Sequence, residues 1–570
     1  MTKGDEKWFQ LYDRAQDFTY KVNDDKLLCL PYVRDLELFE YQIKTVKAAI
    51  NRFKGRVLFC DEVGLGKTVE AGMTMMEYIT RGLARKILII VPPSLVEQWY
   101  TEMKRKFNLD FIKAYDPEFK NMGDVAWGYY DKVIVSIATA KRQNHSSIIA
   151  KIHYDLVIVD EAHHLKNRTT TAWKFVNTLQ KKYIFLLTAT PVQNKLEELY
   201  NLITLLKPGQ LKTYTYFKNN FIGDKEGIQA KNVDRLRSLL SGVMIRNKRS
   251  DVDIKFTKRT AITYSVNLLK EEIKLYDDIS MFIREKYISK NNSVLTRFTL
   301  KNLQEQMGSS IYAAIPTLKR YAEDERLTSD EKSIVSEFSN RAENLIINES
   351  YSNAKIKQMH NIIKEVNDKV LIFTKYKVTQ KFIVEYLQNE GYLVAEFHGG
   401  LKRKEKEEQV AYFKEKAQIF VCTEAGGEGR NLQFCNVMIN YDLPWNPMAI
   451  EQRIGRIHRV GQTRDVYVYN LAAQNTVEHY ILELLDKKIN MFELVIGEVD
   501  MILGDIEEET EFSQIIMDTW VNAETMKDMD EQIDKLGEKL LENKKKYIKM
   551  QELDEGLFGN SFNSDNIEEN

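Results

Sequence analysis

Short, nearly continuous runs of Val, Ile and Leu recur at helix-length intervals, first between residues 56 and 206 and again between residues 370 and 471. Runs without polar alternation are typical of parallel strands buried on both faces, and such strands separated by helix-length segments indicate an α/β sheet. The first set is Val57–Cys60, Ile87–Val91, Val133–Ser136, Leu156–Val159 and Tyr183–Leu187. The second is Val370–Phe373, Val394–His398, Ile419–Cys422, Val437–Asn440 and Val466–Leu471. The sequence therefore predicts two α/β lobes with parallel sheets.

The chain of 570 residues is too long for one hydrophobic core, and its texture changes between the two sets of runs. That middle part is charged and helix-favouring, which predicts a helical insertion. Its basic clusters, such as Arg246, Lys248 and Arg249, are interpreted as solvated helix faces. The predicted segments are an N-terminal segment (1–35), a first lobe (36–206), a helical insertion and linker (207–350), a second lobe (351–500) and a tail (501–570).

The tail is acidic at first and then follows a heptad spacing of apolar residues from Met526 to Met550. Such a spacing is typical of a coiled coil with a partner, or of a helix folded back on the protein's own domains. We favour the second interpretation, and a coiled coil with a protein partner is the alternative.

The charge is balanced, with 82 basic and 83 acidic side chains and a formal net charge of −1. A nucleic-acid surface would therefore require local segregation of charge. The four cysteines contain no C-x-x-C pair, which argues against a disulfide framework or a zinc site. The apolar runs are too short to span a bilayer, and the N-terminus lacks a secretory signal, so we expect a cytoplasmic protein without membrane contact.

The stretch DEVGLGKT, residues 61–68, follows the first apolar run and leads into helix-compatible sequence. Glycines allow backbone N–H groups to point at phosphate, Lys67 can reach the β/γ-phosphates, and the Thr68 hydroxyl can bind Mg²⁺. The usual phosphate-loop pattern begins with glycine where this chain has Asp61, so an ordinary strand–helix turn is the alternative. The residues predicted to bind nucleotide here are Asp61, Glu62, Gly64, Gly66, Lys67 and Thr68.

Asp160 and Glu161 directly follow the run Leu156–Val159. Carboxylates at the carboxyl end of a parallel strand face the crevice in which α/β proteins bind ligands. We predict that Asp160 holds Mg²⁺ and that Glu161 orients and deprotonates the attacking water. A charged strand-to-helix turn is the alternative.

Arg453, Arg456 and Arg459 recur at three-residue steps within the run EQRIGRIHRVGQ, residues 451–462. On a helix this spacing places them on nearby faces. A guanidinium is always charged and forks onto phosphate oxygens, as an arginine finger requires. An ordinary surface helix with scattered salt bridges is the alternative.

The order and wording of these motifs resemble the Swi/Snf-type branch of helicase-like ATPases, and the bacterial RapA-like subgroup in particular. The resemblance spans about residues 36–485, and Asp61 in place of the first glycine is usual in that family. The matching segments are Tyr41-Gln42, 61–68, 90–99, 160–167, 187–194, 370–376, 397–401, 423–433 and 452–462.

This resemblance implies two RecA-like lobes that use ATP and Mg²⁺. It implies that Gln42 reads adenine and that Arg456 and Arg459 reach the γ-phosphate, whereas Arg453 is not required as a finger. It also implies that Gly427 and Gly429 allow close backbone approach to a ligand. The predicted catalytic residues are Glu161, Asp160, Lys67, Arg456, Arg459 and Gln452.

The resemblance further implies translocation on double-stranded DNA without strand separation. Because the sequence shows no evident extra targeting domain, we expect a protein partner to supply specificity, with the heptad tail as its candidate contact. The candidate nucleic-acid contacts are Ser94, Lys141, Arg142, Lys166, Asn167, Lys375, Lys402, Arg403 and Thr423. Two alternatives stay open: a true DNA or RNA unwinding helicase, and a nucleotide-gated protein-interaction module.

Overall fold

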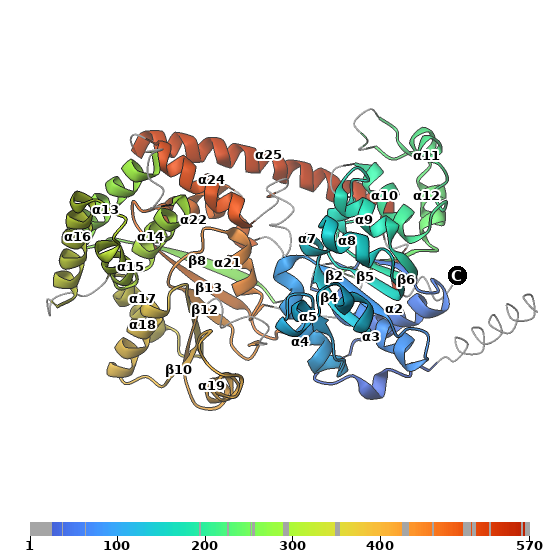
Figure 1. Cartoon of the computed structure of the whole chain (residues 1–570), viewed down its shortest axis with the longest axis horizontal. Helices are drawn as coiled ribbons and strands as arrows, with labels where there is room; N and C mark the ends of the chain where they lie inside the picture. Colours follow the sequence, from blue (N-terminus) through green and yellow to red (C-terminus); the bar gives the residue numbers. More distant parts are fainter. Residues whose placement is uncertain are drawn as a thin grey trace, which may run out of the picture. The chain divides into compact units, whose positions relative to one another are not determined.

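The computed structural model divides the chain into two compact units, the first formed by residues 1–254 with 546–570 and the second by residues 255–545 (Figure 1). The structure describes residues 26–36, 38–62, 64–192, 195–224, 227, 229–250, 252, 257–288, 296–347, 354–423, 432–458, 461–488, 490–493, 503, 509–523, 526–559 and 562–564. The sequence placed the end of the first lobe at residue 206, whereas the first unit also contains residues 207–254 and the end of the chain.

The first unit contains a parallel sheet with the strand order β3-β4-β2-β5-β6-β1-β7. Its strands are β1 (Arg56–Phe59), β2 (Ile87–Val91), β3 (Ile112–Lys113), β4 (Lys132–Ser136), β5 (His153–Val159), β6 (Gln180–Leu187) and β7 (Met244–Ile245). Its α-helices are α2 (Glu40–Asn51), α3 (Lys67–Thr80), α4 (Val96–Phe107), α5 (Pro117–Asn121), α6 (Ala126–Tyr129), α7 (Ile137–Ala140), α8 (Gln143–Ile149), α9 (Thr171–Thr178), α10 (Leu196–Leu206), α11 (Tyr214–Phe221) and α12 (Val233–Leu240). Short 3₁₀ turns are η1 (Leu30–Tyr32), η2 (Pro93–Leu95), η3 (Gly123–Val125) and η4 (Ala162–Leu165).

The second unit contains a parallel sheet with the order β10-β11-β9-β12-β13-β8. Its strands are β8 (Arg259–Val266), β9 (Val370–Thr374), β10 (Val394–Phe397), β11 (Ile419–Thr423), β12 (Val437–Asn440) and β13 (Val466–Ala473). Its helices are α13 (Lys270–Ile288), α14 (Arg297–Ser309), α15 (Ile311–Glu323), α16 (Ser329–Ile347), α17 (Ala354–Glu365), α18 (Lys377–Asn389), α19 (Arg403–Glu415), α21 (Pro447–Ile454), α22 (Val477–Glu483) and α24 (Glu509–Asn522). A π-helical turn, η5 (Leu484–Lys488), and a 3₁₀ turn, η6 (Met491–Glu493), follow α22. Helix α25 (Met526–Phe558) crosses the boundary between the units.

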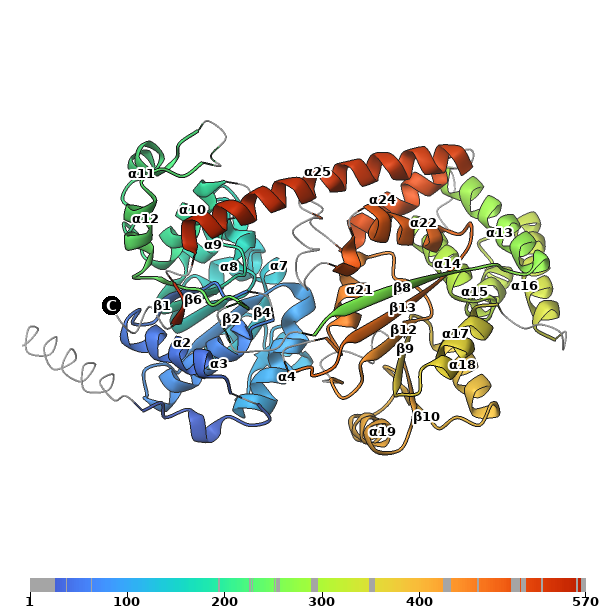
Figure 2. The same ribbon diagram turned by 180° about the vertical axis from the view of Figure 1, so that it is seen from behind.

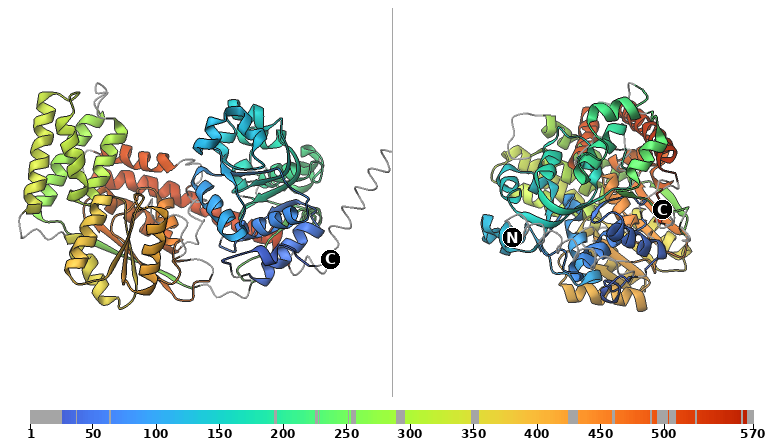
Figure 3. Two further views of the ribbon diagram at one scale, coloured as in Figure 1. Left: turned by 60° about the horizontal axis from the view of Figure 1, so that its bottom comes forward. Right: turned by 90° about the vertical axis from the view of Figure 1, so that its right-hand side faces the viewer.

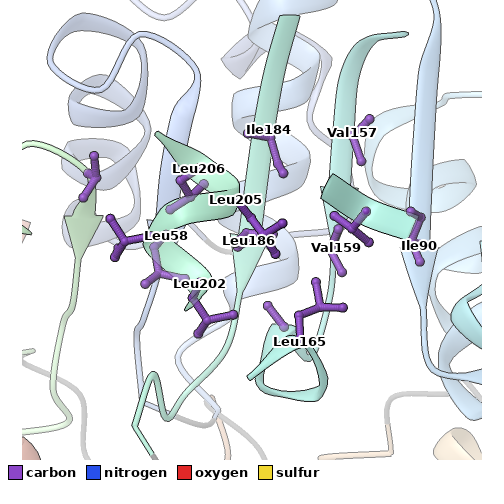
Figure 4. Packing of buried hydrophobic residues seen from close by; sticks show 14 of the residues in the cluster. Leu58, Ile90, Val157, Val159, Leu165, Ile184, Leu186, Leu202, Leu205 and Leu206 are labelled. Atoms are coloured by element: carbon purple, nitrogen blue, oxygen red, sulfur yellow. The ribbon is translucent and has the colours of Figure 1, made fainter. Parts of the chain in front are cut away.

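The apolar runs are strands because both faces of the first sheet are covered. In β1, Leu58 packs with α9 and α10 on one face, while Val57 and Phe59 pack with α2, α3 and α4 on the other. Figure 4 shows the first of these layers, in which Leu58 and Leu186 lie with residues of α10 such as Leu202. Helices also cover both sides of the strands of the second unit (Figure 3). The predicted pair of parallel α/β lobes is therefore confirmed.

The predicted helical insertion is confirmed for α13 to α16, but the same stretch also contains two strands, β7 and β8. The eight-residue strand β8 pairs in parallel with β13 at the edge of the second sheet. Its residues alternate between exposed and half-buried positions, so it lacks the continuous apolar run that marked the central strands. The basic cluster is also placed differently from the prediction, because Arg246 and Lys248 are buried beside β7.

The tail is helical as predicted, and its end packs on the protein's own first unit. Met529, Ile533 and Leu540 of α25 are buried, and Leu557 and Phe558 join the core of the first unit. No described helix is both long enough and apolar enough to cross a membrane.

We predict that the native protein reacts slowly with thiol reagents. Cys29, Cys60, Cys422 and Cys435 are all buried and none forms a disulfide. Burial raises the pKa of Cys435 to about 12 and also raises the pKa of Cys29 and Cys422, which disfavours the reactive thiolate. Titration with a chromogenic disulfide should detect fewer than one fast thiol in native protein and four in denaturant. Two or more fast native thiols would contradict this packing.

Candidate nucleotide and nucleic-acid sites

In the loop that joins β1 to α3, two glycines adopt a backbone conformation that other residues rarely adopt. Gly64 and Gly66 have φ angles of 89° and 93°, the left-handed region that favours glycine. Lys67 is the first residue of α3, and its Nζ donates to the carbonyl oxygen of Asp61 at 2.8 Å. The loop therefore leads directly into a helix N-terminus, where backbone N–H groups and the helix dipole favour an anion.

Two side chains of α2 hold this loop from one side. The hydroxyl of Tyr41 and the Nε2 of Gln42 both donate to the carbonyl oxygen of Leu65, the latter at 3.0 Å. A Cβ at Gly66 would lie only 2.8 Å from Gln42 Nε2. The Gln42 amide thus clamps the loop, and its implied contact with adenine remains a prediction.

Asp61 is fully buried directly after β1, and its partner is a residue that the sequence did not single out. The backbone N–H of Asn247 donates to Asp61 Oδ1 at 2.9 Å, and the Asn247 side-chain amide donates to both carboxylate oxygens at 3.1 and 2.9 Å. Burial raises the pKa of Asp61, and burial with the adjacent Asp61 charge raises the pKa of buried Glu70 well above its ordinary value. The phosphate loop therefore starts from two buried carboxyls, and Asn247 donates hydrogen bonds to one of them, Asp61.

A second residue that sequence reasoning missed as a site residue is Arg249. Its backbone N–H donates to Glu62 Oε2 at 3.0 Å, and its Nη2 would lie 3.0 Å from a Cβ at Gly64. The basic cluster was a signal for this position, but it was interpreted as a solvated helix face. The segment after β7 instead runs beside the phosphate loop.

Asp160 lies directly after β5 and is 8% exposed. Trp99 Nε1 donates to Asp160 Oδ2 at 2.7 Å, and the backbone N–H of Glu161 donates to Oδ1 at 2.9 Å. Burial, followed by the charge of Glu161, raises the pKa of Asp160 to about 7. A bound dication would offset this burial and favour the carboxylate form.

Glu161 adopts a left-handed backbone conformation, with φ 46° and ψ 51°. Non-glycine residues rarely occupy this region, and such strain concentrates at functional sites. Its Oε2 lies 3.2 Å from His163 Nδ1, and its side chain is 36% exposed. Burial opposes ionisation, but His163 and the charge of Lys67 outweigh it and lower the pKa of Glu161 to about 2. Glu161 is therefore a carboxylate that can accept a hydrogen bond from water.

The phosphate loop and the Asp160–Glu161 pair lie at the same edge of the sheet, because they follow the carboxyl ends of the parallel strands β1 and β5. The positive charge of Lys67 acts on both carboxyls and opposes the rise that burial causes in the pKa of Asp160. Their donor set fits Mg²⁺, which usually takes one or two carboxylates and completes its octahedron with phosphate oxygens and waters. Thr68, the second residue of α3, supplies the hydroxyl expected in such a site.

Two of the three candidate arginines of the second unit, Arg453 and Arg456, lie among the described residues. Arg453 donates from Nη1 to Asn440 Oδ1 at 3.1 Å and to the carbonyl oxygen of Asp442 at 2.8 Å, and its side chain is 3% exposed. It therefore has a structural role, in line with the resemblance, which does not require it as a finger. Arg456 follows α21 and is also largely buried, whereas Gln452 is exposed on α21. Arg459, Gly427 and Gly429 lie outside the described residues.

The candidate nucleic-acid contacts of the first unit all follow the carboxyl ends of three adjacent strands, β4, β2 and β5. Lys141 and Arg142 follow α7 and are exposed, and Asn167 is exposed after η4. Lys166 is half-buried, and Ser94 lies in η2 after β2. These positions share one edge of the sheet with the phosphate loop, which follows β1.

The candidates of the second unit follow β10, β11 and β9, which are also adjacent. Lys402 is exposed at the start of α19, and Arg403 is the first residue of that helix. Thr423 is buried at the end of β11, and Lys375 pairs with Glu305. The structure therefore places these positions at one sheet edge, where Lys402 is exposed, Lys375 is half-buried and Thr423 is buried.

Comparison with known proteins identifies the family. The model of the SNF2-related domain matches residues 41–327, and that of the helicase conserved C-terminal domain matches residues 354–461. The chain belongs to the SNF2-related helicase family. It is 40% identical over 541 residues to the "Uncharacterized ATP-dependent helicase YqhH" of Bacillus subtilis (strain 168), covering 94% of both chains. The protein is thus an ATPase of the helicase family.

A more distant relative is the "RNA polymerase-associated protein RapA" of Proteus mirabilis (strain HI4320), which is 29% identical over 492 residues. That match covers 80% of this chain but only half the length of the relative. Among solved structures, the "Sulfolobus solfataricus SWI2/SNF2 ATPase core in complex with dsDNA" matches with 24% identity and a TM-score of 0.38, covering 86% of this chain and 97% of that chain.

We predict that Gly66→Ala weakens nucleotide binding by about tenfold or more. The added Cβ would meet Gln42 Nε2 at 2.8 Å, and the φ of 93° is strained for alanine by about 1–2 kcal/mol. Equilibrium binding of a fluorescent ADP analogue measures the effect. Gly82→Ala is the matched control, because Gly82 also has positive φ but would meet nothing within 4 Å. Equal affinity of the two variants would contradict the role of the loop.

Proposed function

We propose that this protein is an ATP- and Mg²⁺-dependent motor that translocates on double-stranded DNA and displaces or remodels protein–DNA complexes without separating the strands. The observation that carries the proposal is the arrangement of both sheets. In each unit, candidate nucleic-acid contacts follow three adjacent strands, while the nucleotide-site residues follow neighbouring strands at the same edge. A conformational change in the residues that bind nucleotide can therefore be transmitted along one sheet edge to the residues that bind nucleic acid.

Phosphoryl transfer requires positioning and charge neutralisation more than covalent chemistry. Lys67 would contact the β/γ-phosphates, and Thr68 and Asp160 would hold Mg²⁺, which neutralises charge that develops in the transition state. Glu161 would orient the attacking water and accept its proton. Arg456 and Arg459 would supply the positive charge of the second unit when the lobes close around ATP.

Hydrolysis and product release would then change the relation between the lobes, and alternate gripping of the phosphate backbone would give stepping. Backbone gripping is independent of sequence and sensitive to salt. Specificity would come from a protein partner, and association of the relative RapA with RNA polymerase, stated in its name, is one example of such a partnership.

A true unwinding helicase is the second candidate. The word helicase in the name of the B. subtilis relative favours it. The ATPase site is compatible with both functions. Which nucleic acid stimulates turnover distinguishes the two.

We predict that Glu161→Gln binds ATP but loses hydrolysis by roughly a hundred- to ten-thousandfold, because the amide cannot accept the proton of the attacking water. Single-turnover ATPase assays measure the rate, and equilibrium binding measures affinity. Lys67→Ala serves as the comparison, since loss of its phosphate contact should weaken binding itself. Normal turnover by Glu161→Gln would refute its assignment.

We predict that double-stranded DNA stimulates the ATPase more than single-stranded DNA or RNA at matched low salt. Replacing both Lys141 and Arg142 by alanine should weaken DNA binding at all sequences and reduce the salt dependence of log K by about two. Arg85→Ala is the control, because Arg85 is exposed at the opposite end of β2.

The three substrates distinguish the proposals. Stronger stimulation by single strands or RNA, together with duplex unwinding, would favour the helicase. Absence of stimulation by any nucleic acid would favour a nucleotide-gated interaction module.

A further inference from the structure

A segment near the C-terminus, which we call the C-terminal clasp (the described residues 555–559 and 562–564), packs in the first unit. Leu557, Phe558 and Phe562 are at most 1% exposed and belong to the same core as β1 and α10. In Figure 2 the end of α25 lies beside α12. The clasp thus contributes large apolar side chains to the lobe that carries the phosphate loop.

Polar contacts fix where the clasp lies. The Arg237 guanidinium of α12 donates to the carbonyl oxygens of Gly556 and Leu557, both at 2.7 Å. These carbonyls belong to the last turn of α25, where no helical N–H can pair with them. Lys248 Nζ pairs with Glu555 at 2.5 Å, and the Lys248 side chain is only 5% exposed. The clasp is therefore attached to the segment that follows β7.

After the helix, the clasp runs along this same segment. The backbone N–H of Arg246 donates to the carbonyl oxygen of Phe562 at 2.8 Å. The backbone N–H of Ser564 donates to Asn247 Oδ1 at 2.9 Å, and Ser564 is 2% exposed. The clasp thus reaches the residue that solvates Asp61.

The hydrogen bond from Ser564 requires the same orientation of the Asn247 amide as the Asp61 carboxylate does. Because Oδ1 accepts from Ser564, the NH₂ group must face Asp61. A flipped amide would place its oxygen against a carboxylate and its NH₂ against an N–H donor, and neither contact is a hydrogen bond. The backbone of the clasp therefore reinforces the amide orientation that donates to Asp61 and, at 3.0 Å, to Thr45 Oγ1.

We infer that the C-terminal clasp is a positioning element of the nucleotide site: through Asn247 it holds Asp61, and with it the phosphate loop, in the conformation that binds nucleotide. The backbone carbonyl oxygen of Asp61 in turn accepts a hydrogen bond from the Lys67 ammonium. The same segment also contacts the loop through Arg249 and Glu62. The inference rests on the nucleotide site proposed above.

Two consequences follow from linkage. If docking of the clasp favours nucleotide binding, nucleotide binding favours docking by the same factor. Loss of the clasp should therefore raise the Kd for nucleotide and the KM for ATP, and should leave kcat at saturating ATP within about twofold. A role in stability alone would not separate KM from kcat in this way.

The first experiment uses the full chain with Phe558 and Phe562 both replaced by alanine, which removes the two rings that anchor the clasp. We expect the Kd of a fluorescent ADP analogue to rise about tenfold, within the usual range of coupling between sites. Ile548→Ala is the matched control, because Ile548 lies on the same helix and is 45% exposed. Unchanged Kd in a folded variant whose clasp exchanges freely would overturn the inference.

The second experiment uses the unmodified protein, so that it does not depend on the folding of a variant. Hydrogen exchange of the Arg246 and Ser564 amides should slow when ADP and Mg²⁺ are added. Exchange that is independent of nucleotide would overturn the inference. Lys67→Ala separates the two proposals. If this variant retains full nucleotide affinity, the proposed nucleotide site is wrong. If it loses affinity while the clasp amides of the unmodified protein do not respond to nucleotide, only the role of the clasp is rejected.

Discussion

Each lobe depends on one buried carboxylate that lies just beyond the carboxyl end of a parallel strand. Asp61 follows β1, and Asp442 follows β12. Removing an ionised carboxylate from water costs several kcal/mol unless donors replace the lost hydration. The donors for Asp61 come from Asn247, which is 186 residues away in sequence. Because Asp61 is buried, β7 and the segment after it must pack beside β1, where Asn247 supplies these hydrogen bonds.

Asp442 has the same effect in the second lobe. Its carboxylate accepts from the hydroxyls of Ser309 and Thr374, both at 2.6 Å, and from the backbone N–H of Lys375 at 2.9 Å. These donors lie at the ends of α14 and β9, while Arg453 of α21 donates to the Asp442 carbonyl. The helical insertion and the sheet are thus joined at the edge where the candidate nucleic-acid contacts emerge. In both lobes, the hydrogen bonds to a buried carboxylate hold the segments at that edge together.

The sequence predicts the parts of the structure whose cause is local. Central strands of both sheets are buried on two faces, so they appear in the sequence as apolar runs. The phosphate loop can be recognised from Gly64 and Gly66 beside Lys67. The edge strand β8 is half-exposed and leaves no such run. The role of Asn247 could not be predicted from the sequence, because only folding brings this residue next to Asp61. Arg453 has the spacing of a phosphate contact, but its environment in the folded lobe assigns it a structural role.

The C-terminal clasp also bears on how the chain connects its two compact units. The chain passes between the units twice, at residues 254–255 and 545–546. The first passage leaves the segment that carries Asn247 and Arg249, and the second leads through α25 to the clasp, which returns to Asn247. Both covalent connections therefore start or end at the residues that support the phosphate loop. Since a ligand can shift an equilibrium only by its differential affinity for two states, the proposed effect of the clasp depends on the contacts that nucleotide makes with the phosphate loop itself.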